Sequence, residues 1–461
     1  MANATVVKNR YEGECMETSA VGTQESPSAH AGTGAAAGGE KLSPWRVSII
    51  ASMGSAVEYF DFALYGVLAV MMSGHFFPTT DGLDALLGTL GIFASAFFVR
   101  PLGGVFFGWL GDRFGRKKTL LTTVLGMGAA SACVGLLPTY STAGIWAPIL
   151  LLVCRVTQGF FAGGEVSGAV TYIAEVAPAN RRGMFGSFNP AGVGIGTGSA
   201  ALVAGIVGLI LGADDMREWG WRIPFLLCFP LILLTVWARQ HLEESPKFKG
   251  AQKGHEPVKA PLSDVLSNHG KSLFCVVVIA TAQNACAYLG LVYFNIHLTK
   301  VMHYPSQVVY WLMAAGPILS ALLMPFFGRL SDSVGRRPVL IAGYIAYVIF
   351  TPLALWMTSQ GDFNMAIAAV LLVFFAFAMV QAVGYPLYGE MFPTHVRYTG
   401  VSVGFNIGAI LGGASTPYVS TWLVQQTGDK TSPAYFVMAT AVCALIVFFT
   451  MRETARENLE D

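Results

Sequence analysis

The stretch "GWLGDRFGRKKTL" at residues 108–120 occurs a second time, with substitutions, as "GRLSDSVGRRPVL" at residues 328–340. Both copies keep the spacing G-x-x-x-D-x-x-G-R, and an apolar run precedes each of them. A motif repeated at this distance predicts a chain made of two similar halves. The residues that define the motif in its two copies are Gly108, Asp112, Gly115, Arg116, Asp332 and Arg336.

A second pair of stretches supports this duplication. The stretch "YIAEVAPANRRG" at residues 172–183 corresponds to "LYGEMFPTHVRYTG" at residues 387–400, and all offsets between the copies lie between 215 and 220 residues. The two halves therefore share one order of segments. The aligned charged residues are Glu175 with Glu390 and Arg182 with Arg397.

The composition is typical of a membrane protein. Of the 461 residues, 54% are hydrophobic and 12% are charged, and the mean hydropathy is +0.56. Soluble domains carry about 25% charged residues. A net charge of +1 without a long basic run argues against nucleic-acid binding. The seven cysteines are scattered, so we expect neither disulfides nor a metal site, and no cofactor other than a coupling proton.

Twelve apolar segments follow residue 43, and each is long enough to cross about 30 Å of hydrocarbon as a helix. Their predicted limits are 46–72, 84–111, 119–138, 146–172, 183–211, 222–240, 271–298, 306–331, 338–357, 364–389, 398–424 and 434–451. We predict an all-α membrane protein with twelve transmembrane helices in two pseudo-symmetric six-helix halves. The predicted divisions are a disordered tail at 1–43, a bundle at 44–240, a central loop at 241–270, a bundle at 271–451 and a short tail at 452–461.

Lysine and arginine residues gather in the even-numbered loops. The second loop carries four of them between residues 113 and 118, and the central loop carries four lysines, whereas the first, third and ninth loops have none and the fifth is mixed. Because positive loops stay inside, we expect the even loops and both termini to be cytoplasmic. This indicates a multi-pass protein of the bacterial cytoplasmic (inner) membrane.

Charged residues also occur inside the predicted spans, where lipid makes a charge cost about 2.5–3.5 kcal/mol or more. The stretch "GSAVEYFDFALYG" at residues 54–66 carries Glu58 and Asp61, which share one helical face with Tyr65. Such residues are expected to face the interior of the bundle. We predict that Asp61 or Glu58 exchanges protons, with Asp61 slightly favoured.

The fourth span carries Arg155, Gln158 and Glu165 on one stripe, and the second span carries Arg100 near its middle. A guanidinium group matches a carboxylate, so Arg155 and Arg100 are candidates for binding a substrate carboxylate. Gln158 and Tyr65 are further candidate substrate-binding residues. Glu165 is a further candidate proton carrier. The structural alternatives are that Arg100 ties two helices together and that Glu165 braces its own helix.

The second half has almost no ionisable residue near the middle of a span, and His297 is placed near a helix end and is not expected to carry protons. Neutral polar residues share helical faces there instead, so we expect them to bind the remainder of the substrate, or else to satisfy hydrogen bonds between helices. These neutral candidates of the second half are Asn284, Tyr288, Gln381, Tyr385, Tyr388 and Asn406. Asn189 of the first half is a further candidate of the same kind.

These residues suggest a coupling hypothesis. In the empty carrier Asp61 pairs with Arg155, and protonation of Asp61 releases the arginine for a substrate anion. Substrate and proton then travel together, because either alone leaves an uncompensated charge.

Six long stretches carry a resemblance to a known family. They are "VEYFDFALYG", "FFVRPLGGVFFGWLGDRFGRKK", "GIWAPILLLVCRVTQGFFAGGE", "EWGWRIPF", "LEESPKF" and "GEMFPTHVRYTGVSVGFN". With them the chain resembles the metabolite:proton symporter family of the major facilitator superfamily, which includes α-ketoglutarate, shikimate, citrate and proline/betaine permeases. The resemblance implies alternating access. It also implies that the repeated motif and its Glu–Arg partners latch the cytoplasmic side.

We therefore predict proton-coupled symport of a small organic acid, such as a di- or tricarboxylate, by a monomer that is not an enzyme. The alternative is uptake of a zwitterionic osmolyte such as betaine or proline, for which Tyr59, Phe60, Phe62 and Tyr65 would supply an aromatic cage. The proline/betaine permease ends in a long coiled coil, whereas this sequence stops about ten residues after its last span, which favours the organic acid.

Overall fold

The computed structural model describes residues 44–77, 82–114, 116–163, 177–240, 261–393 and 396–455, together with residues 170 and 173. The first half contains α1 (Pro44–Phe76), α2 (Gly82–Phe114), α3 (Arg116–Leu136), α4 (Tyr140–Ala143), α5 (Trp146–Ala162), η1 (Ala179–Arg181), α7 (Arg182–Gly186), α8 (Phe188–Leu211), α9 (Ala213–Asp215), η2 (Met216–Gly220) and α10 (Arg222–Gln240). Helices thus account for most of the described residues of the first six predicted spans, and residues 164–169, 171 and 172 of the fourth span lie outside the described part.

The second half is helical in the same way. It contains α12 (Pro261–Asn268), α13 (Gly270–Tyr288), η3 (Leu289–Tyr293), α14 (Phe294–Ile296), η4 (His297–Val301), α15 (Ser306–Val334), α16 (Arg336–Ser359), α17 (Phe363–Glu390), α18 (Arg397–Gly408), η5 (Ala409–Ala414), α19 (Ser415–Thr427) and α20 (Pro433–Thr450). The elements η3, η4 and η5 are π-helical turns that interrupt the seventh and eleventh predicted spans. The prediction of an all-α protein is confirmed.

Eight helical segments of the described residues are long and apolar enough to cross a membrane, and a bent pair, Ala213–Gly220 with Arg222–Trp237, would make a ninth. The apolar parts of α3 and α5 are shorter. Large apolar side chains on the outer surface, such as Phe98, Leu322 and Phe326, are more than 60% exposed. Such exposure fits contact with lipid chains rather than with water.

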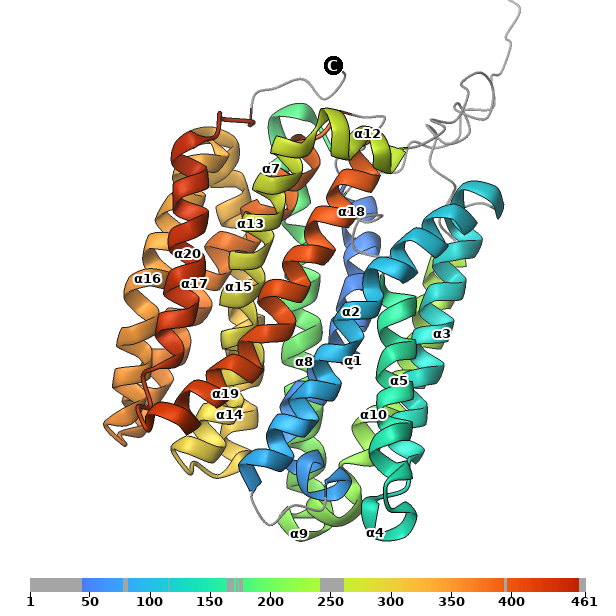
Figure 1. The fold of residues 1–461 in the computed structure, drawn as a ribbon, viewed down its shortest axis with the longest axis vertical. Helices are drawn as coiled ribbons and strands as arrows, with labels where there is room; N and C mark the ends of the chain where they lie inside the picture. Colours follow the sequence, from blue (N-terminus) through green and yellow to red (C-terminus); the bar gives the residue numbers. More distant parts are fainter. Residues whose placement is uncertain are drawn as a thin grey trace, which may run out of the picture. The chain divides into compact units, whose positions relative to one another are not determined.

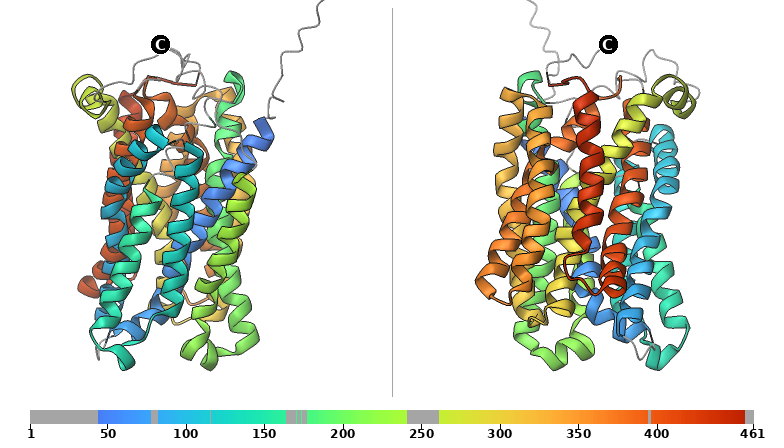
Figure 2. Two further views of the ribbon diagram at one scale, coloured as in Figure 1. Left: turned by 90° about the vertical axis from the view of Figure 1, so that its right-hand side faces the viewer. Right: turned by 60° about the vertical axis from the view of Figure 1, so that its left-hand side comes forward.

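Figure 1 shows α3, α5 and α10 on one side of residues 42–461 and α16, α17 and α20 on the other. Figure 2 shows the same helices from two further directions. Helix α8 packs against both α1 and α15, so it joins the two halves. Glycines allow this approach: a Cβ atom at Gly196 would lie 2.0 Å from the carbonyl oxygen of Ala56, and one at Gly198 would lie 2.8 Å from that of Ala314.

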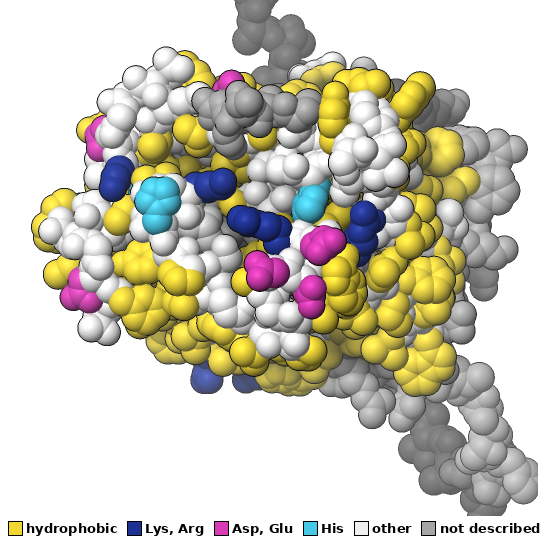
Figure 3. All heavy atoms as spheres, turned by 90° about the horizontal axis from the view of Figure 1, so that it is seen from below, with side chains coloured by type: hydrophobic (Ala, Val, Ile, Leu, Met, Phe, Trp, Pro, Cys, Tyr) yellow, Lys and Arg dark blue, Asp and Glu magenta, His cyan; other side chains and the backbone are white. Residues whose placement is uncertain are grey.

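The two ends of the bundle are distinguished by their short helices. Helices α7 and α12 lie at one end, the α7/α12 end, and α4 and α9 lie at the other, the α4/α9 end (Figure 1). Trp45 in α1 packs against Phe185 of α7, with ring centroids 5.4 Å apart, so α1 begins at the α7/α12 end. The α4/α9 end is the face seen in Figure 3, where charged side chains lie across the middle.

Candidate functional site

A chain of hydrogen bonds joins α1 to α5 in the interior of the first half. The Gln158 Nε2 amide donates to both carboxylate oxygens of Asp61, at 3.1 and 3.0 Å. The Gln158 Oε1 atom accepts a hydrogen bond of 2.8 Å from Arg155 Nη1. All three side chains are fully buried. Asp61 and Arg155 are therefore coupled through one amide, whereas the coupling hypothesis has them pair directly.

Two further helices complete the surroundings of Asp61. Ser131 Oγ of α3 also accepts from Gln158 Nε2, at 2.9 Å, and Cys228 Sγ of α10 lies 3.9 Å from Asp61 Oδ1. Asp61 thus lies among α1, α3, α5 and α10. No sequence signal points to Ser131 or Cys228, because single small polar residues in apolar spans usually only fill space.

The other side of the Arg155 guanidinium faces aromatic rings. Its Cζ atom lies 4.3 Å from the ring centroid of Tyr65, 4.9 Å from that of Phe62 and 5.5 Å from that of Phe93. Among the described residues, Arg155 Nε and Nη2 have no hydrogen-bond partner. A buried guanidinium with unused N–H donors can bind a carboxylate through two parallel hydrogen bonds.

Glu58 and Arg100 form a second buried group. Arg100 Nη2 of α2 donates to Glu58 Oε1 of α1 at 3.3 Å, and both side chains are almost completely inaccessible. The Arg100 Cζ atom also lies 4.2 Å from the ring centroid of Phe62 and 4.8 Å from that of Phe97. This pair ties α1 to α2, which is the structural alternative considered for Arg100.

Aromatic side chains of α1, α2 and α13 connect the two groups. The ring centroid of Tyr288 lies 5.9 Å from that of Phe93 and 5.4 Å from that of Phe97. Tyr65 stacks on Phe93 at 5.9 Å, and its hydroxyl donates to the carbonyl oxygen of Thr89. Within the described part of the chain, the hydroxyl group of Tyr288 has no partner. We call Phe62, Tyr65, Phe93, Phe97 and Tyr288 the aromatic cluster.

The aromatic cluster differs from the cage expected from the sequence. Tyr59 and Phe60 are buried, and among the described residues no arginine lies over either ring, although the Tyr59 side chain hydrogen-bonds to Arg100. Phe62 and Tyr65 contribute as expected. Neighbouring positions on one helix point in different directions, so a cage needs rings from several helices. The sequence of one span could not reveal Phe93 and Phe97.

Apart from Tyr288, which belongs to the aromatic cluster, predicted neutral residues of the second half contact one another, and the Tyr385 side chain also hydrogen-bonds to Tyr59 of α1. Gln283 Nε2 donates to Gln381 Oε1 at 2.6 Å, and the Tyr388 hydroxyl donates to Gln283 Oε1 at 2.5 Å. Gln283 was not among the predicted site residues, although it directly precedes the predicted residue Asn284. Tyr385 packs against Tyr388 and Phe405, with centroids 6.3 and 5.7 Å apart.

Two of the predicted asparagines have contacts within their own helices, whereas Asn189 of α8 bonds to Ser55 of α1 and, among the described residues, has no partner for its Nδ2 atom. Asn284 and Asn406 each donate to the carbonyl oxygen four residues earlier in their own helices, at 2.8 Å. Asn189 Oδ1 accepts from the Ser55 hydroxyl at 2.5 Å. His297 is fully buried, with Nε2 2.9 Å from Thr358 Oγ1. A polar contact inside the bundle therefore accounts for His297.

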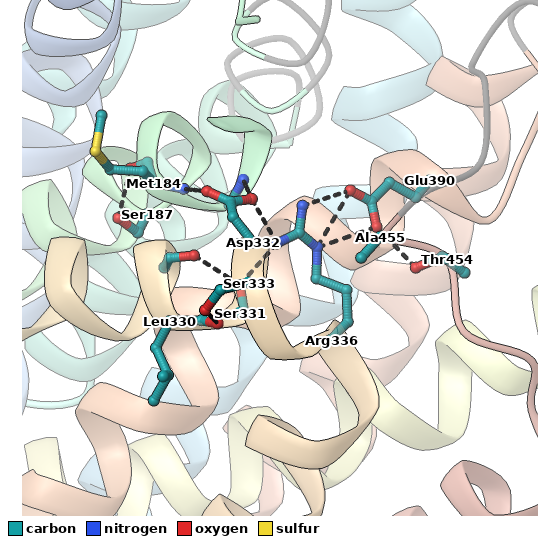
Figure 4. Close-up of polar contacts among 12 residues, drawn as sticks. Met184, Ser187, Leu330, Ser331, Asp332, Ser333, Arg336, Glu390, Thr454 and Ala455 are labelled. Carbon is teal, nitrogen blue, oxygen red and sulfur yellow. Dashed lines mark hydrogen bonds and ion pairs between the residues drawn. The ribbon is translucent and has the colours of Figure 1, made fainter. Parts of the chain in front are cut away.

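At the α7/α12 end, a network of charges joins the two halves (Figure 4). Asp332 of α15 accepts hydrogen bonds from the backbone N–H groups of Gly183 and Met184, at 2.7 and 2.9 Å. Arg336 Nη1 donates to Asp332 Oδ1 at 2.8 Å, and Arg336 Nη2 donates to Glu390 Oε1 at 2.9 Å. One carboxylate of the second half thus holds the start of α7 in the first half.

The remaining predicted gating residues are less completely described. Arg182 borders a small cavity together with Glu390, and Arg397 Nε donates to the carbonyl oxygen of Phe392 at 3.2 Å. The predicted residues that lie outside the described part are Gly115, Glu165 and Glu175, together with the side chains of Gly108, Asp112 and Arg116.

Comparison with known proteins identifies the fold and the family. Residues 47–268 match the family model "Sugar (and other) transporter", and residues 273–461 match the model "Major Facilitator Superfamily". The proline/betaine transporter of Salmonella typhimurium is 36% identical over 422 residues, which cover 89% of this chain and 84% of that protein. This chain belongs to the major facilitator superfamily. The resemblance to its metabolite:proton symporters, the twelve-helix fold and the prediction of a transporter rather than an enzyme are confirmed.

Other relatives of this superfamily member carry similar names. The glycine betaine/proline/ectoine/pipecolic acid transporter OusA of Dickeya dadantii is 35% identical over 422 residues, covering 89% of this chain and 83% of that protein. A putative proline/betaine transporter of Staphylococcus aureus is 33% identical over 416 residues, covering 89% of each chain. Among solved structures, the partially occluded inward-open xylose transporter XylE of E. coli matches with a TM-score of 0.72 at 19% identity, covering 90% of this chain and 99% of that one.

These relatives contradict the predicted organic-acid substrate and favour the stated alternative. The error has a physical reason. Arginine binds a carboxylate whether or not the same molecule also carries a cation, so two buried arginines do not distinguish an organic acid from a zwitterion. The bacterial relatives and the spanning helices also identify a multi-pass inner-membrane protein.

Proposed function

We propose that this major facilitator protein takes up a zwitterionic osmolyte, such as betaine or proline, together with a proton. The relatives named proline/betaine transporters support this substrate class. The single structural observation that carries the proposal is the buried Arg155, whose Nε and Nη2 groups are unpartnered among the described residues and whose guanidinium lies against aromatic rings.

The two ends of a zwitterion match these two features. The substrate carboxylate binds Arg155 Nε and Nη2 through two parallel hydrogen bonds. The ammonium group lies against the aromatic cluster, where Phe93, Phe97 and Tyr288 are in mutual contact. Aromatic ring faces attract a quaternary or secondary ammonium group without forming hydrogen bonds.

Protonation of Asp61 is transmitted to Arg155 by Gln158. Ionised Asp61 only accepts hydrogen bonds, so the Gln158 amide points its NH₂ group to Asp61 and its oxygen to Arg155. Protonated Asp61 donates instead, which favours the reversed amide. The NH₂ group of Gln158 then faces Arg155, which has only donors. Arg155 loses its acceptor, and a substrate carboxylate replaces it.

The charge balance makes this transport electrogenic. The formal charges of Glu58, Arg100, Asp61 and Arg155 sum to zero, and a zwitterion adds no net charge. The bound proton therefore leaves one positive charge to be moved inward. A membrane potential of 100 mV, negative inside, contributes about 2.3 kcal/mol to this step.

Alternating access supplies the pathway. Following the distribution of basic residues, we place the α7/α12 end and both termini in the cytoplasm and the α4/α9 end outside. The network around Asp332 then closes the cytoplasmic side, and its bonds break when the transporter opens inward. Because each half contributes to the seam formed by α8 and α15, a single chain is the functional unit in this proposal.

Proteoliposomes test this function directly. We expect radiolabelled glycine betaine or proline to accumulate when the outside is acidified, and to accumulate more when a potassium diffusion potential makes the interior negative. Arg155→Ala, checked for a monodisperse fold, should abolish accumulation. Uptake of citrate or α-ketoglutarate without uptake of betaine or proline would refute the proposed substrate, and uptake indifferent to the pH gradient would refute proton coupling.

A further inference from the structure

A separate cavity of about 460 Å³ lies at the α4/α9 end, between the two halves. Its walls come from the start of α2 on one side and from η3, α14, η4 and α19 on the other. This volume falls within the range of about 300–1,000 Å³ that small-molecule sites occupy. Aliphatic side chains, including Leu83 and Val424, make up half of the lining residues.

One cationic side chain lines this cavity, and one acid lies next to a lining residue without lining the cavity itself. Lys300 lines it, and in the described part of the chain its ammonium group has neither an ion pair nor a hydrogen bond. Gln425 also lines it, and its Nε2 donates to Asp84 Oδ1 across the gap between the halves at 3.5 Å. The cavity thus has one lining cation, Lys300, and one lining amide, Gln425, which is bonded to an acid.

The hydroxyl groups of the other two polar lining residues, Thr421 and Tyr293, already have polar contacts within the protein. The Thr421 hydroxyl donates to the carbonyl oxygen of Pro417 at 2.8 Å, so it can only accept from a ligand. Tyr293 has its hydroxyl 3.5 Å from His297 Nδ1, which directs that group toward the interior of the second half. Its ring is then the part that forms the cavity wall.

We propose that this cavity is an external binding site for the transported zwitterion, separate from Arg155. The substrate carboxylate binds the Lys300 ammonium and the Gln425 amide, and the substrate cation lies near Asp84 and the Tyr293 ring. The proposal rests on the proposed function, because that function defines the substrate class. A molecule held here lies between the halves, on the side from which uptake begins.

A lysine substitution tests the site without touching the buried network. Lys300→Gln removes the half-buried positive charge that pairs with the substrate carboxylate, so we expect the KM for glycine betaine uptake to rise about fivefold while kcat changes less than twofold. The matched control is Lys430→Gln, an exposed lysine of the same end that does not line the cavity. The control should leave the KM unchanged. An unchanged KM in Lys300→Gln, or equal increases in both variants, would overturn the proposal.

Two further measurements distinguish this cavity from the Arg155 site and from a lipid-binding site. In Arg155→Ala, weak binding of radiolabelled betaine should persist, and adding Lys300→Gln should remove it. If the wild-type protein transports no betaine, the proposed function is refuted. If the wild-type protein transports betaine but Lys300→Gln has an unaltered KM, only the proposal of an external site is refuted. Because phosphatidylethanolamine headgroups are also zwitterionic, the assays use phosphatidylglycerol liposomes. An effect seen only when phosphatidylethanolamine is added would assign the cavity to lipid and overturn the proposal.

Discussion

The guanidinium groups of Arg100 and Arg155 lie over one aromatic ring, that of Phe62, with Cζ atoms 4.2 and 4.9 Å from its centroid. Two buried cations are thus stabilised by the same quadrupole, and each such contact is worth about 0.5–2 kcal/mol. The ring connects the Glu58–Arg100 pair to the Asp61–Gln158–Arg155 chain without a hydrogen bond.

Removal of this ring should weaken both arginine sites. We expect Phe62→Leu to lower the thermal stability and to raise the KM for betaine about threefold to tenfold, because two cation–π contacts are lost. Phe62→Tyr keeps the ring and should stay near wild type. Thermal unfolding and uptake kinetics measure both effects. The control is Phe98→Leu, on the exposed surface of α2, and a similar KM increase in that variant would contradict the cation–π role of Phe62.

Asp61→Asn separates coupling from binding. An amide at this position cannot release a proton, but it can still donate a hydrogen bond, as the protonated acid does. We expect pH-driven accumulation to fall at least tenfold, while exchange of labelled for unlabelled betaine across the membrane persists. Asp362→Asn, an exposed helix cap, is the control and should accumulate normally. Normal accumulation in Asp61→Asn would remove Asp61 from the coupling scheme.

Gln158→Leu tests the relay itself. In wild type we expect betaine affinity to rise as the external pH falls, because protonated Asp61 releases Arg155 for the substrate. Without the amide, Asp61 and Arg155 lose their shared partner, so the KM at pH 5.5 and at pH 7.5 should agree within about twofold. The variant should also lose about 1–3 kcal/mol of stability from unsatisfied buried groups. A full pH dependence in Gln158→Leu would show that the proton signal reaches Arg155 by another route.

The network at the α7/α12 end should control which side of the transporter is open. Asp332→Asn removes the charge from two backbone hydrogen bonds and from the pair with Arg336, a loss of about 1.5–3 kcal/mol. We expect the population open at this end to increase about tenfold or more. Spin labels at Arg181→Cys and Ser333→Cys, in a cysteine-free background, would report the longer distance. Asp429→Asn, at the opposite end, should not change it.

Close packing of α2 against α5 positions Arg155 and Gln158. A Cβ atom at Gly159 would lie 2.0 Å from the carbonyl oxygen of Ala96, so Gly159→Ala must push the two helices apart. We expect a loss of about 1–3 kcal/mol in stability and impaired transport. Gly91→Ala on α2 has open space around the added methyl group and should be neutral or slightly stabilising. Thermal unfolding of both variants measures the difference in stability, and an equal stability of Gly159→Ala and Gly91→Ala would contradict the close-packing role of Gly159.

The sequence was sufficient to predict the helices and the buried charges. Apolar segments of the right length define spans in any membrane, and an acid such as Asp61 within a span must face the interior. The partners of these charges could not be predicted, since the distance between α1 and α5 depends on packing. Gln158 lies one turn from Arg155 in sequence, but its role as a bridge depends on the position of Asp61 in another helix.

The aromatic cluster and the external cavity could not be predicted from the sequence for the same reason, because each is formed by residues of several helices. Phe93, Phe97 and Tyr288 look like ordinary apolar or structural residues in their own spans, and only the meeting of α2 with α13 gives them a role. The substrate class was mispredicted for a related reason. A carboxylate is bound by charged residues, which are rare in a span and easily noticed, whereas an ammonium group is bound by aromatic rings, which occur in every span.

The π-helical turn η5 has a consequence for engineering. A π turn holds one residue more than an α-helical turn, so it rotates everything that follows by about 100° relative to an uninterrupted helix. Deleting a single residue between Ala409 and Ala414 would restore regular winding, and it would swing Thr421 and Gln425 away from Lys300. One inserted position thus fixes the orientation of a wall of the external cavity, and homologues lacking it would present a different surface to arriving solutes.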